Sequence, residues 1–289
     1  MKETAFSFGP GGALVGVLTE PSNPRPDLPA VVLFNVGLNH RVGPYRVWVE
    51  LARALAVNGG TALRFDVSGL GDSARRKDTL SDTRRAVADM KEALDVLEKR
   101  TGIQRFVLIG LCSGVDGSHV LVLEDARVVG AVFIDGYSFE TLGYKIRRKL
   151  RVFEIDRWRR LLTRQLKIGS RHEVGTRDEI FVREYPTPTS VATDIERMLR
   201  RGVKLLFIYT GGSDRAFNAA EQFHEMLAPA DFRGRVEVIY DERADHTYSH
   251  VHDRHRLIRT LVAWWERSLR SVQREDRSKA RSEETLNAS

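Results

Sequence analysis

Short apolar runs alternate with segments of helical periodicity along the chain, and this alternation constrains the fold more than any other feature of the sequence. Each run is bounded by polar or glycine-rich residues, as expected for strands that are buried on both faces of a sheet. Strands that alternate with helices in this way predict a mostly parallel sheet with helices on both faces, the α/β class. The six runs are Ala30–Phe34, Thr61–Phe65, Phe106–Ile109, Val128–Ile134, Val203–Tyr209 and Val236–Tyr240.

The segments before and between these strands complete the expected architecture. Residues 6–8 and 14–19 flank a Gly-Pro-Gly-Gly turn and predict a β-hairpin, which would form an antiparallel edge of the sheet. A helix is expected from Pro44 to about Val57, where Asn-Gly-Gly follows. Residues 81–99 repeat apolar side chains at helical spacing and predict an amphipathic helix.

One interval breaks the alternation and predicts an insertion. Between Ile134 and Val203 the chain has no clear buried strand, and this interval is too long for a simple crossover. We therefore expect a helical cap at 138–190, inserted into a core formed by 1–137 and 191–270. Residues 271–289 are almost wholly polar, which predicts a disordered tail.

The formal net charge of +7 is concentrated in the expected cap. Residues 145–171 contain eleven Lys and Arg against only Glu154 and Asp156. Such a field attracts acidic partners, although a solvated helix face is the simpler interpretation. Apolar residues such as Trp158 among these charges leave a membrane-surface role open. Aromatic and base-reading side chains do not alternate here, so no nucleic-acid partner is expected.

Targeting signals are not apparent. No apolar run approaches the roughly 20 residues of a membrane span, and residues 1–10 lack the apolar segment of a signal peptide. We therefore expect a cytoplasmic protein without stable membrane insertion. The single cysteine cannot form an internal disulfide, so its sequence context must indicate its role.

That cysteine, Cys112, lies in the pattern Gly110-Leu-Cys-Ser-Gly114, directly after an expected strand and before a helix rich in small residues. A nucleophile on a strained strand-to-helix turn needs small residues two positions before and after it. The helix N-terminus behind it favours a negatively charged sulfur. We interpret Cys112 as a nucleophile; the alternative is a buried structural cysteine. Ser113 is a rival nucleophile, but its neighbours lack the required spacing.

A cysteine thiol is mostly protonated at neutral pH, so the turn predicts a base and an orienting acid later in the chain. His246 follows the last expected strand and is the candidate base. Asp214, in Thr210-Gly-Gly-Ser-Asp, is the preferred acid because it follows a strand at the edge where open α/β sheets build their sites. Asp135, which ends the preceding strand, is the rival acid, and either aspartate could instead cap a turn.

Backbone N–H groups must stabilise the oxyanion of an acyl-transfer reaction. The residue after the nucleophile, Ser113, supplies one, and the loop after the strand at 30–34 supplies the other, from Val36 or Gly37. His250, His252 and His255 do not share one helix face, so neither a metal site nor any other cofactor is expected.

Several of these segments together resemble bacterial α/β-hydrolases with a cysteine at the nucleophile position that accompany exosortase-type polysaccharide systems. The resemblance covers about 34–265 and is carried by 34–46, 64–73, 110–114, 210–214 and 245–247. A cysteine at this turn is also similar to that of dienelactone hydrolase. The resemblance implies the α/β-hydrolase fold and assigns Cys112, Asp214 and His246 as a triad. It does not fix the substrate.

The expected function is that of an acyl hydrolase or acyltransferase acting on an ester or thioester through a Cys-His-Asp triad. The substrate is expected to be a small molecule or a carrier-bound acyl group. The alternative is a non-catalytic hydrolase-like binding protein, but such a protein would not need the acid and the histidine. The oligomeric state is not predicted.

Overall fold

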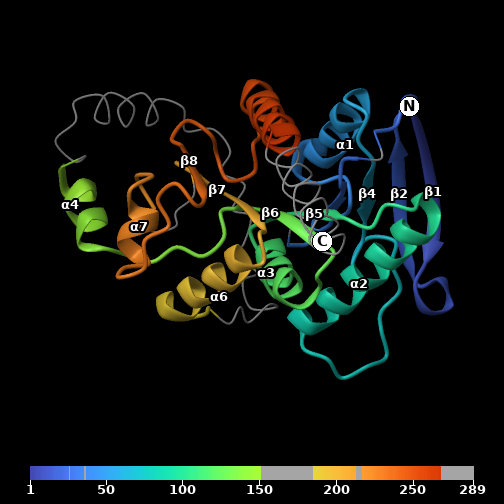
Figure 1. The fold of residues 1–289 in the computed structure, drawn as a ribbon, viewed down its shortest axis with the longest axis horizontal. Helices are drawn as coiled ribbons and strands as arrows, with labels where there is room; N and C mark the ends of the chain where they lie inside the picture. The colour runs from blue at the N-terminus through green and yellow to red at the C-terminus, as the bar shows by residue number, and fades with distance from the viewer. Residues whose placement is uncertain (26, 36, 151–184, 213–216, 268–289) are drawn as a thin grey trace, which may run out of the picture.

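A computed structural model describes the chain except for residues 26, 36, 151–184, 213–216 and 268–289. Its centre is an eight-stranded sheet in the order β1-β2-β4-β3-β5-β6-β7-β8 (Figure 1). The strands are β1 (Lys2–Phe8), β2 (Leu14–Glu20), β3 (Ala30–Leu33), β4 (Ala62–Phe65), β5 (Phe106–Leu111), β6 (Val128–Ile134), β7 (Lys204–Thr210) and β8 (Glu237–Asp241). The six apolar runs correspond to β3 to β8.

The strand directions confirm a mostly parallel sheet with one antiparallel edge. β1 pairs antiparallel with β2, and β2 pairs antiparallel with β4, as a terminal hairpin should. All the remaining neighbours, from β4 to β8, pair in parallel. The carboxyl ends of these parallel strands therefore meet along one edge of the sheet, which is where ligands bind in open α/β folds.

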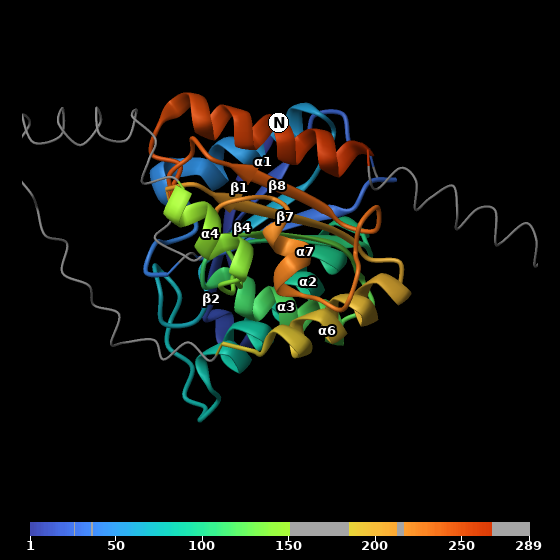
Figure 2. The same ribbon diagram turned by 90° about the vertical axis from the view of Figure 1, so that its left-hand side faces the viewer.

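Helices cover both faces of the sheet, and Figure 2 separates the two layers. α1 (Val47–Val57) and a helix over residues 251–267 lie on one face. α2 (Asp82–Thr101), α3 (Gly114–Glu124) and α6 (Pro188–Arg200) lie on the other. The buried side chains form two apolar clusters, one on each side of the sheet, as expected for strands without a polar face.

The expected helices begin and end at the signals in the sequence. Pro44 begins a 3₁₀ turn (Pro44–Arg46), and α1 follows directly. At its end, a Cβ on Gly60 would lie 2.6 Å from the ring of Trp265, so glycine is needed for the close approach of the C-terminal helix. Gly102, with φ of 72°, ends α2 in the left-handed conformation that favours glycine.

The base of the predicted cap is partly described. α4 (Leu142–Leu150) begins after β6, and residues 151–184 lie outside the described residues. α4 packs beside α7 (Gln222–Met226), where Arg147 donates hydrogen bonds to Glu225 and, at 2.8 Å, to Asn218. The predicted tail at 271–289 also lies outside the described residues. None of the described helices is both long and apolar enough to span a bilayer.

Candidate active site

Cys112 occupies a strained turn directly after β5. Its φ is +56°, a left-handed conformation that non-glycine residues rarely adopt. The turn is tight, because a Cβ on Gly110 would lie 2.7 Å from the carbonyl oxygen of Gly114 and 2.8 Å from the hydroxyl of Ser118. The first glycine of the pattern is therefore required sterically, as the nucleophile interpretation assumed.

Helix α3 begins immediately behind this cysteine, so its N-terminus favours a thiolate at position 112. Ser113 is different from Cys112 in backbone and contacts. It has ordinary helical angles (φ −64°, ψ −22°), and its hydroxyl accepts a hydrogen bond from the Gly37 N–H at 3.0 Å. Of the two candidate nucleophiles, the strained position belongs to Cys112.

The register of the sheet brings an aspartate next to this cysteine. Leu111 of β5 pairs with Ile134 of β6, so the residues that follow them, Cys112 and Asp135, are neighbours at the carboxyl edge. The backbone continues this pairing, since the Cys112 N–H donates to the Ile134 carbonyl at 2.9 Å. Asp135 also has a positive φ, of 47°. Each of these two adjacent strands is thus followed directly by a residue with a strained backbone, Cys112 after β5 and Asp135 after β6.

His246 reaches this pair from the loop after β8. Its Nδ1 lies 2.7 Å from Oδ2 of Asp135, which is only 1% exposed. The ring also hydrogen-bonds with Cys112. Because Nδ1 is taken by Asp135, Nε2 is the ring nitrogen left for the sulfur. Thr210, at the end of β7, donates to the same carboxylate from its backbone N–H at 2.7 Å and its hydroxyl at 2.6 Å.

These contacts favour a protonated His246. Burial by itself would lower the pKa of the imidazole from its ordinary value of 6.5. The hydrogen bonds to Asp135 and Cys112, together with their negative charges, outweigh burial and raise the pKa to about 9. At neutral pH the ring is therefore an imidazolium, as required for a thiolate–imidazolium pair.

The carboxylate that contacts His246 is that of Asp135, the second of the two predicted acids. Asp214, the preferred prediction, lies outside the described residues, whereas Asp135 occupies the partner position at His246 Nδ1. Asp135 also satisfies the expected chain order of nucleophile, acid and histidine. The signal for it was available: Asp135 follows its strand directly, while Asp214 comes four residues after the end of β7.

The loops after β7 and β8 pack so closely that His246 is held against the sheet edge. A Cβ on Gly211 would lie 2.2 Å from the Glu242 carbonyl oxygen, and one on Gly212 would lie 2.6 Å from Cα of Asp245. Both glycines of the Thr-Gly-Gly segment are therefore needed for this contact. Asp245 in turn accepts hydrogen bonds from the backbone and hydroxyl groups of Thr247 and Ser249, which fixes the turn that carries His246.

Two of the three predicted oxyanion-hole residues, Gly37 and Ser113, lie together at the same edge of the sheet. Gly37, in the loop after β3, has φ of +52° and directs its N–H at the Ser113 side chain, so this loop contacts the turn that carries the nucleophile. The Ser113 backbone N–H follows Cys112 directly. Val36, the other predicted donor, lies outside the described residues.

A buried carboxylate that sequence analysis did not single out holds this loop in place. Asp66 is fully buried directly after β4, and it accepts hydrogen bonds from the Asn35 side chain at 3.1 Å and the Arg41 backbone N–H at 2.6 Å. The Arg41 guanidinium pairs with the same carboxylate. Asn35 spans the loop by donating to the Asn39 carbonyl at 2.9 Å and accepting from the Val67 N–H. The position of Asp66 directly after a strand was the signal in the sequence that could have identified it.

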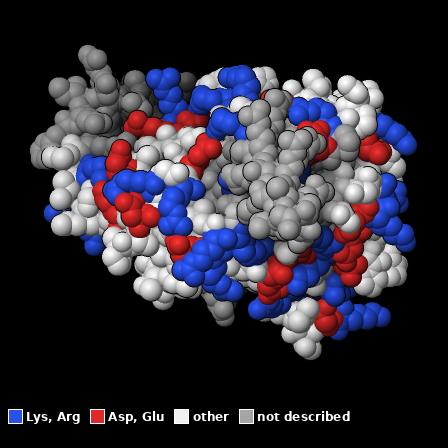
Figure 3. All heavy atoms as spheres, in the orientation of Figure 1, with Lys and Arg blue, Asp and Glu red and all other residues white. Residues whose placement is uncertain are grey.

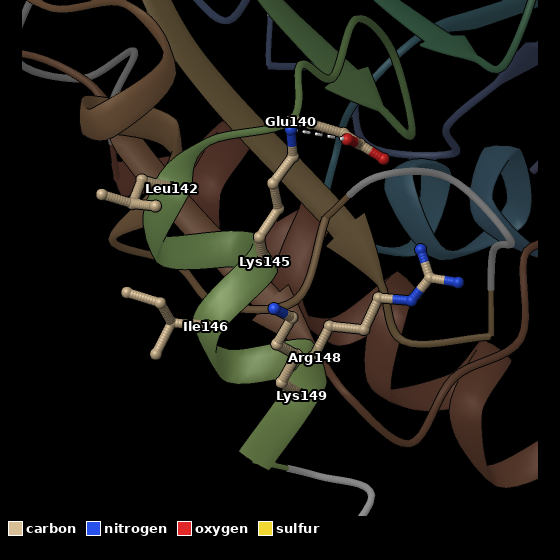
Figure 4. A pocket seen from close by; sticks show the side chains of 6 residues that line it. All are labelled: Glu140, Leu142, Lys145, Ile146, Arg148 and Lys149. Atoms are coloured by element: carbon tan, nitrogen blue, oxygen red, sulfur yellow. Dashed lines mark ion pairs between the residues drawn. The ribbon is translucent and has the colours of Figure 1, made fainter.

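The basic patch lies apart from this site as far as it is described. On α4, Lys145, Arg148 and Lys149 are exposed, and Lys145 pairs with Glu140 at 3.5 Å (Figure 4). A pocket of about 470 Å³ on this helix is not lined by Cys112, Asp135 or His246. Elsewhere on the described part of the face shown in Figure 3, basic and acidic side chains are interspersed. The remaining basic residues of 151–171 lie outside the described residues.

Among the residues described, no group of three or more His, Cys, Asp or Glu side chains is arranged to hold a metal ion. His252 instead lies beside Asp253 at 3.1 Å and is 76% exposed. The site described above contains a cysteine, a histidine and a buried carboxylate.

Comparison with known proteins agrees with the topology. The sequence profile of the alpha/beta hydrolase family matches residues 31–272, which is most of the chain, so the protein belongs to this family. No curated protein matches it significantly.

Solved structures show the same fold at low sequence identity. An esterase of Pyrococcus furiosus has a TM-score of 0.59 at 15% identity, covering 93% of this chain and 90% of its own. A serine hydrolase homologue from Coxiella burnetii has a TM-score of 0.56 at 16% identity, covering 91% and 96%. A serine hydrolase without a lid from Xanthomonas campestris has a TM-score of 0.55 at 13% identity, covering 94% and 95%.

Proposed function

We propose that this protein is an acyl hydrolase or acyltransferase that acts on an ester or thioester through Cys112, His246 and Asp135. One observation carries the proposal: a cysteine held at a positive φ hydrogen-bonds with a histidine whose other nitrogen lies 2.7 Å from a buried aspartate. A nucleophile, a base and a group that orients the base are the parts that covalent acyl transfer requires.

In the first half of the reaction, the Cys112 thiolate attacks the acyl carbon, a C–S bond forms, and the carbonyl π electrons move to the oxygen. Backbone N–H groups, that of Ser113 among them, stabilise this oxyanion. When the C=O bond re-forms, the bond to the leaving group breaks, and the leaving alkoxide or thiolate takes the proton of the His246 imidazolium. The product is an acyl-cysteine thioester.

In the second half, neutral His246 removes a proton from water or from another acceptor, which attacks the thioester. The C–S bond breaks, and the thiolate–imidazolium pair is restored. Asp135 keeps the proton of His246 on Nδ1 throughout, so that Nε2 can exchange protons with the reacting groups. An acyl-cysteine is itself a thioester, so acyl transfer from a thioester donor to Cys112 exchanges one thioester for another at little cost in free energy.

The relationship to cysteine-containing α/β-hydrolases found with exosortase-type systems is part of this proposal. It rests on the cysteine at the strained turn of this chain, Cys112. The solved structures of the same fold named above include serine hydrolases. The proposal does not depend on an identified substrate, since the acyl group could be small or carrier-bound.

The test is intact-mass analysis after exposure to p-nitrophenyl esters and acyl thioesters. The protein should either turn over the donor or gain the mass of one acyl group, and Cys112→Ala should do neither. Ser190→Ala, which removes an exposed hydroxyl on α6, is the matched control and should behave as wild type. No adduct and no turnover with any acyl donor would contradict the enzymatic proposal and favour a binding protein.

The exposed cations of α4 give a reason to include acidic substrates. We propose that a phosphate-bearing donor such as an acyl-CoA is attracted by Lys145, Arg148 and Lys149. Raising the salt concentration should then slow acylation by acyl-CoA more than acylation by a neutral p-nitrophenyl ester. Equal salt dependence for the two donors would remove this part of the proposal.

A further inference from the structure

The contact between Gly37 and Ser113 gives the serine hydroxyl a defined role. Ser113 precedes α3 at the N-cap position, where serine commonly caps the helix, yet its side chain makes no capping hydrogen bond. It accepts the Gly37 N–H at 3.0 Å instead. The hydroxyl is thus directed toward the loop that faces the nucleophile, rather than toward the helix that it begins.

A hydroxyl has one proton to donate as well as lone pairs to accept. Since a Ser113 lone pair is occupied by the Gly37 N–H, the O–H group remains available as a donor, and accepting a hydrogen bond strengthens it in that role. The backbone N–H of the same residue is the expected oxyanion donor next to Cys112. Only Cα and Cβ separate the N and Oγ atoms of one serine. The two donors therefore lie close enough together to donate to the same oxygen atom.

We propose that the Ser113 hydroxyl is a side-chain donor to the oxyanion, polarised by the Gly37 N–H. This inference rests on the proposed function and adds a residue to it. As the Cys112–carbon bond forms and the carbonyl oxygen becomes negative, Ser113 donates hydrogen bonds from both its N–H and its O–H. The serine proton stays on Oγ throughout, so His246 remains the only group that transfers a proton.

The direct test compares two reactions of Cys112 that differ in whether an oxyanion forms. Acylation by a thioester forms one, whereas alkylation by iodoacetamide displaces iodide without forming one. Ser113→Ala should slow acylation by roughly a hundredfold, the lower end of the range seen when one oxyanion donor is removed, and should leave alkylation within about twofold of wild type. Ser113→Thr, which keeps the hydroxyl, should retain most of the acylation rate.

Three results would overturn the inference. Acylation by Ser113→Ala within about twofold of wild type, or faster, would mean that the hydroxyl does not help the oxyanion. A parallel loss of acylation and alkylation would mean that Ser113 only holds the turn in place. A wild-type protein that is alkylated at Cys112 but acylated by no donor would refute the proposed function itself, a failure that differs from the first two. Ser190→Ala again serves as the control for removal of a hydroxyl.

Discussion

The Nδ1 atom of His246 lies 2.7 Å from Oδ2 of Asp135, although the two residues are separated by 111 positions in the sequence. The acid comes from β6, the strand that pairs with the strand of the nucleophile. Asp135 and Cys112 directly follow these two adjacent strands, whose residues are almost all buried, so both groups that contact the imidazole are firmly placed. A histidine whose turn is fixed and whose partner lies at the end of a rigid strand is well placed for catalysis.

Asp135→Asn should slow acylation of Cys112 by roughly tenfold to a hundredfold, because an amide neither stabilises the imidazolium nor fixes its tautomer. The effect should be smaller than in a serine enzyme, since a thiol relies less on the orienting acid than a hydroxyl does. Asp214→Asn is the matched variant and should remain within about threefold of wild type. Acylation rates from stopped-flow release of p-nitrophenol measure both; a larger loss in Asp214→Asn would reassign the acid.

The pH dependence should follow the protonation of His246. Its pKa of about 9 lies above the ordinary 6.5, so the imidazolium persists through neutral pH and is lost as the pH rises through about 9. Release of an alkoxide needs this proton, whereas release of p-nitrophenolate does not. Acylation by an alkyl ester should therefore decline above pH 9, while acylation by the p-nitrophenyl ester should not.

NMR titration of the His246 ring gives a direct check of the same pKa. Wild type should titrate near pH 9, and Asp135→Asn should titrate at lower pH because a hydrogen-bonded negative charge has been removed. A wild-type ring that titrates near pH 6.5, together with alkyl and p-nitrophenyl esters that share one pH profile, would exclude the resting ion pair.

The sequence allowed the α/β fold to be predicted because each buried strand is a separate apolar run bounded by turn residues. The strained turn at Cys112 could also be located, since Gly110 and Gly114 have a steric reason to flank it. The two predicted acids were harder to separate. Asp135 follows its strand directly, whereas Asp214 comes four residues after its strand. That β6 pairs with β5 and so places Asp135 beside Cys112 is a non-local fact that the local pattern does not contain.

The place of Asp66 at a strand end was visible in the sequence, but its pairing with Arg41 was not. Asp66 and Arg41 are 25 residues apart, and nothing in their local pattern indicates that they pair. Their proximity follows from the parallel pairing of β3 with β4, whose carboxyl ends place the two following loops side by side. Buried charges that link loops in this way become visible only when the strand order is known.

The two glycines of the nucleophile turn should differ in their tolerance of a methyl group. A Cβ on Gly110 would meet backbone and side-chain atoms at 2.7 and 2.8 Å, too close to relieve without moving the turn. A Cβ on Gly114 would meet the Asn35 carbonyl oxygen at 3.2 Å, which a small shift can relieve. Gly110→Ala should lower the free energy of unfolding by about 3 kcal/mol and remove activity.

Gly114→Ala is the companion variant of this pair. It should remain folded but acylate more slowly, because the shift is imposed on the loop that faces the nucleophile. Urea denaturation measures stability, and the rate of Cys112 acylation by a thioester measures the second effect. Equal stability of the two alanine variants would show that the turn is less crowded than the structure indicates.

The buried carboxylate of Asp66 holds the loop after β3 through Asn35 and Arg41. Asp66→Asn should lower the free energy of unfolding by about 3 kcal/mol, since an amide cannot accept all these hydrogen bonds and leaves the Arg41 charge partly unpaired. Asp72→Asn is the matched control, because Asp72 also pairs with Arg41, at 2.7 Å, but is 65% exposed. Exposed pairs contribute little, so this variant should change stability by less than about 1 kcal/mol.

Asp66→Asn should also lose more activity than Asp72→Asn, just as it should lose more stability. In Asp66→Asn, the loop that carries Gly37 loses its anchor, so acylation by a thioester should fall more than alkylation by iodoacetamide, which needs no oxyanion donor. Urea denaturation and the two rates of Cys112 modification provide the measurements. If Asp72→Asn destabilised the protein as much as Asp66→Asn, the charge on Arg41 would matter more than the buried hydrogen bonds, and the anchoring role of Asp66 would be wrong.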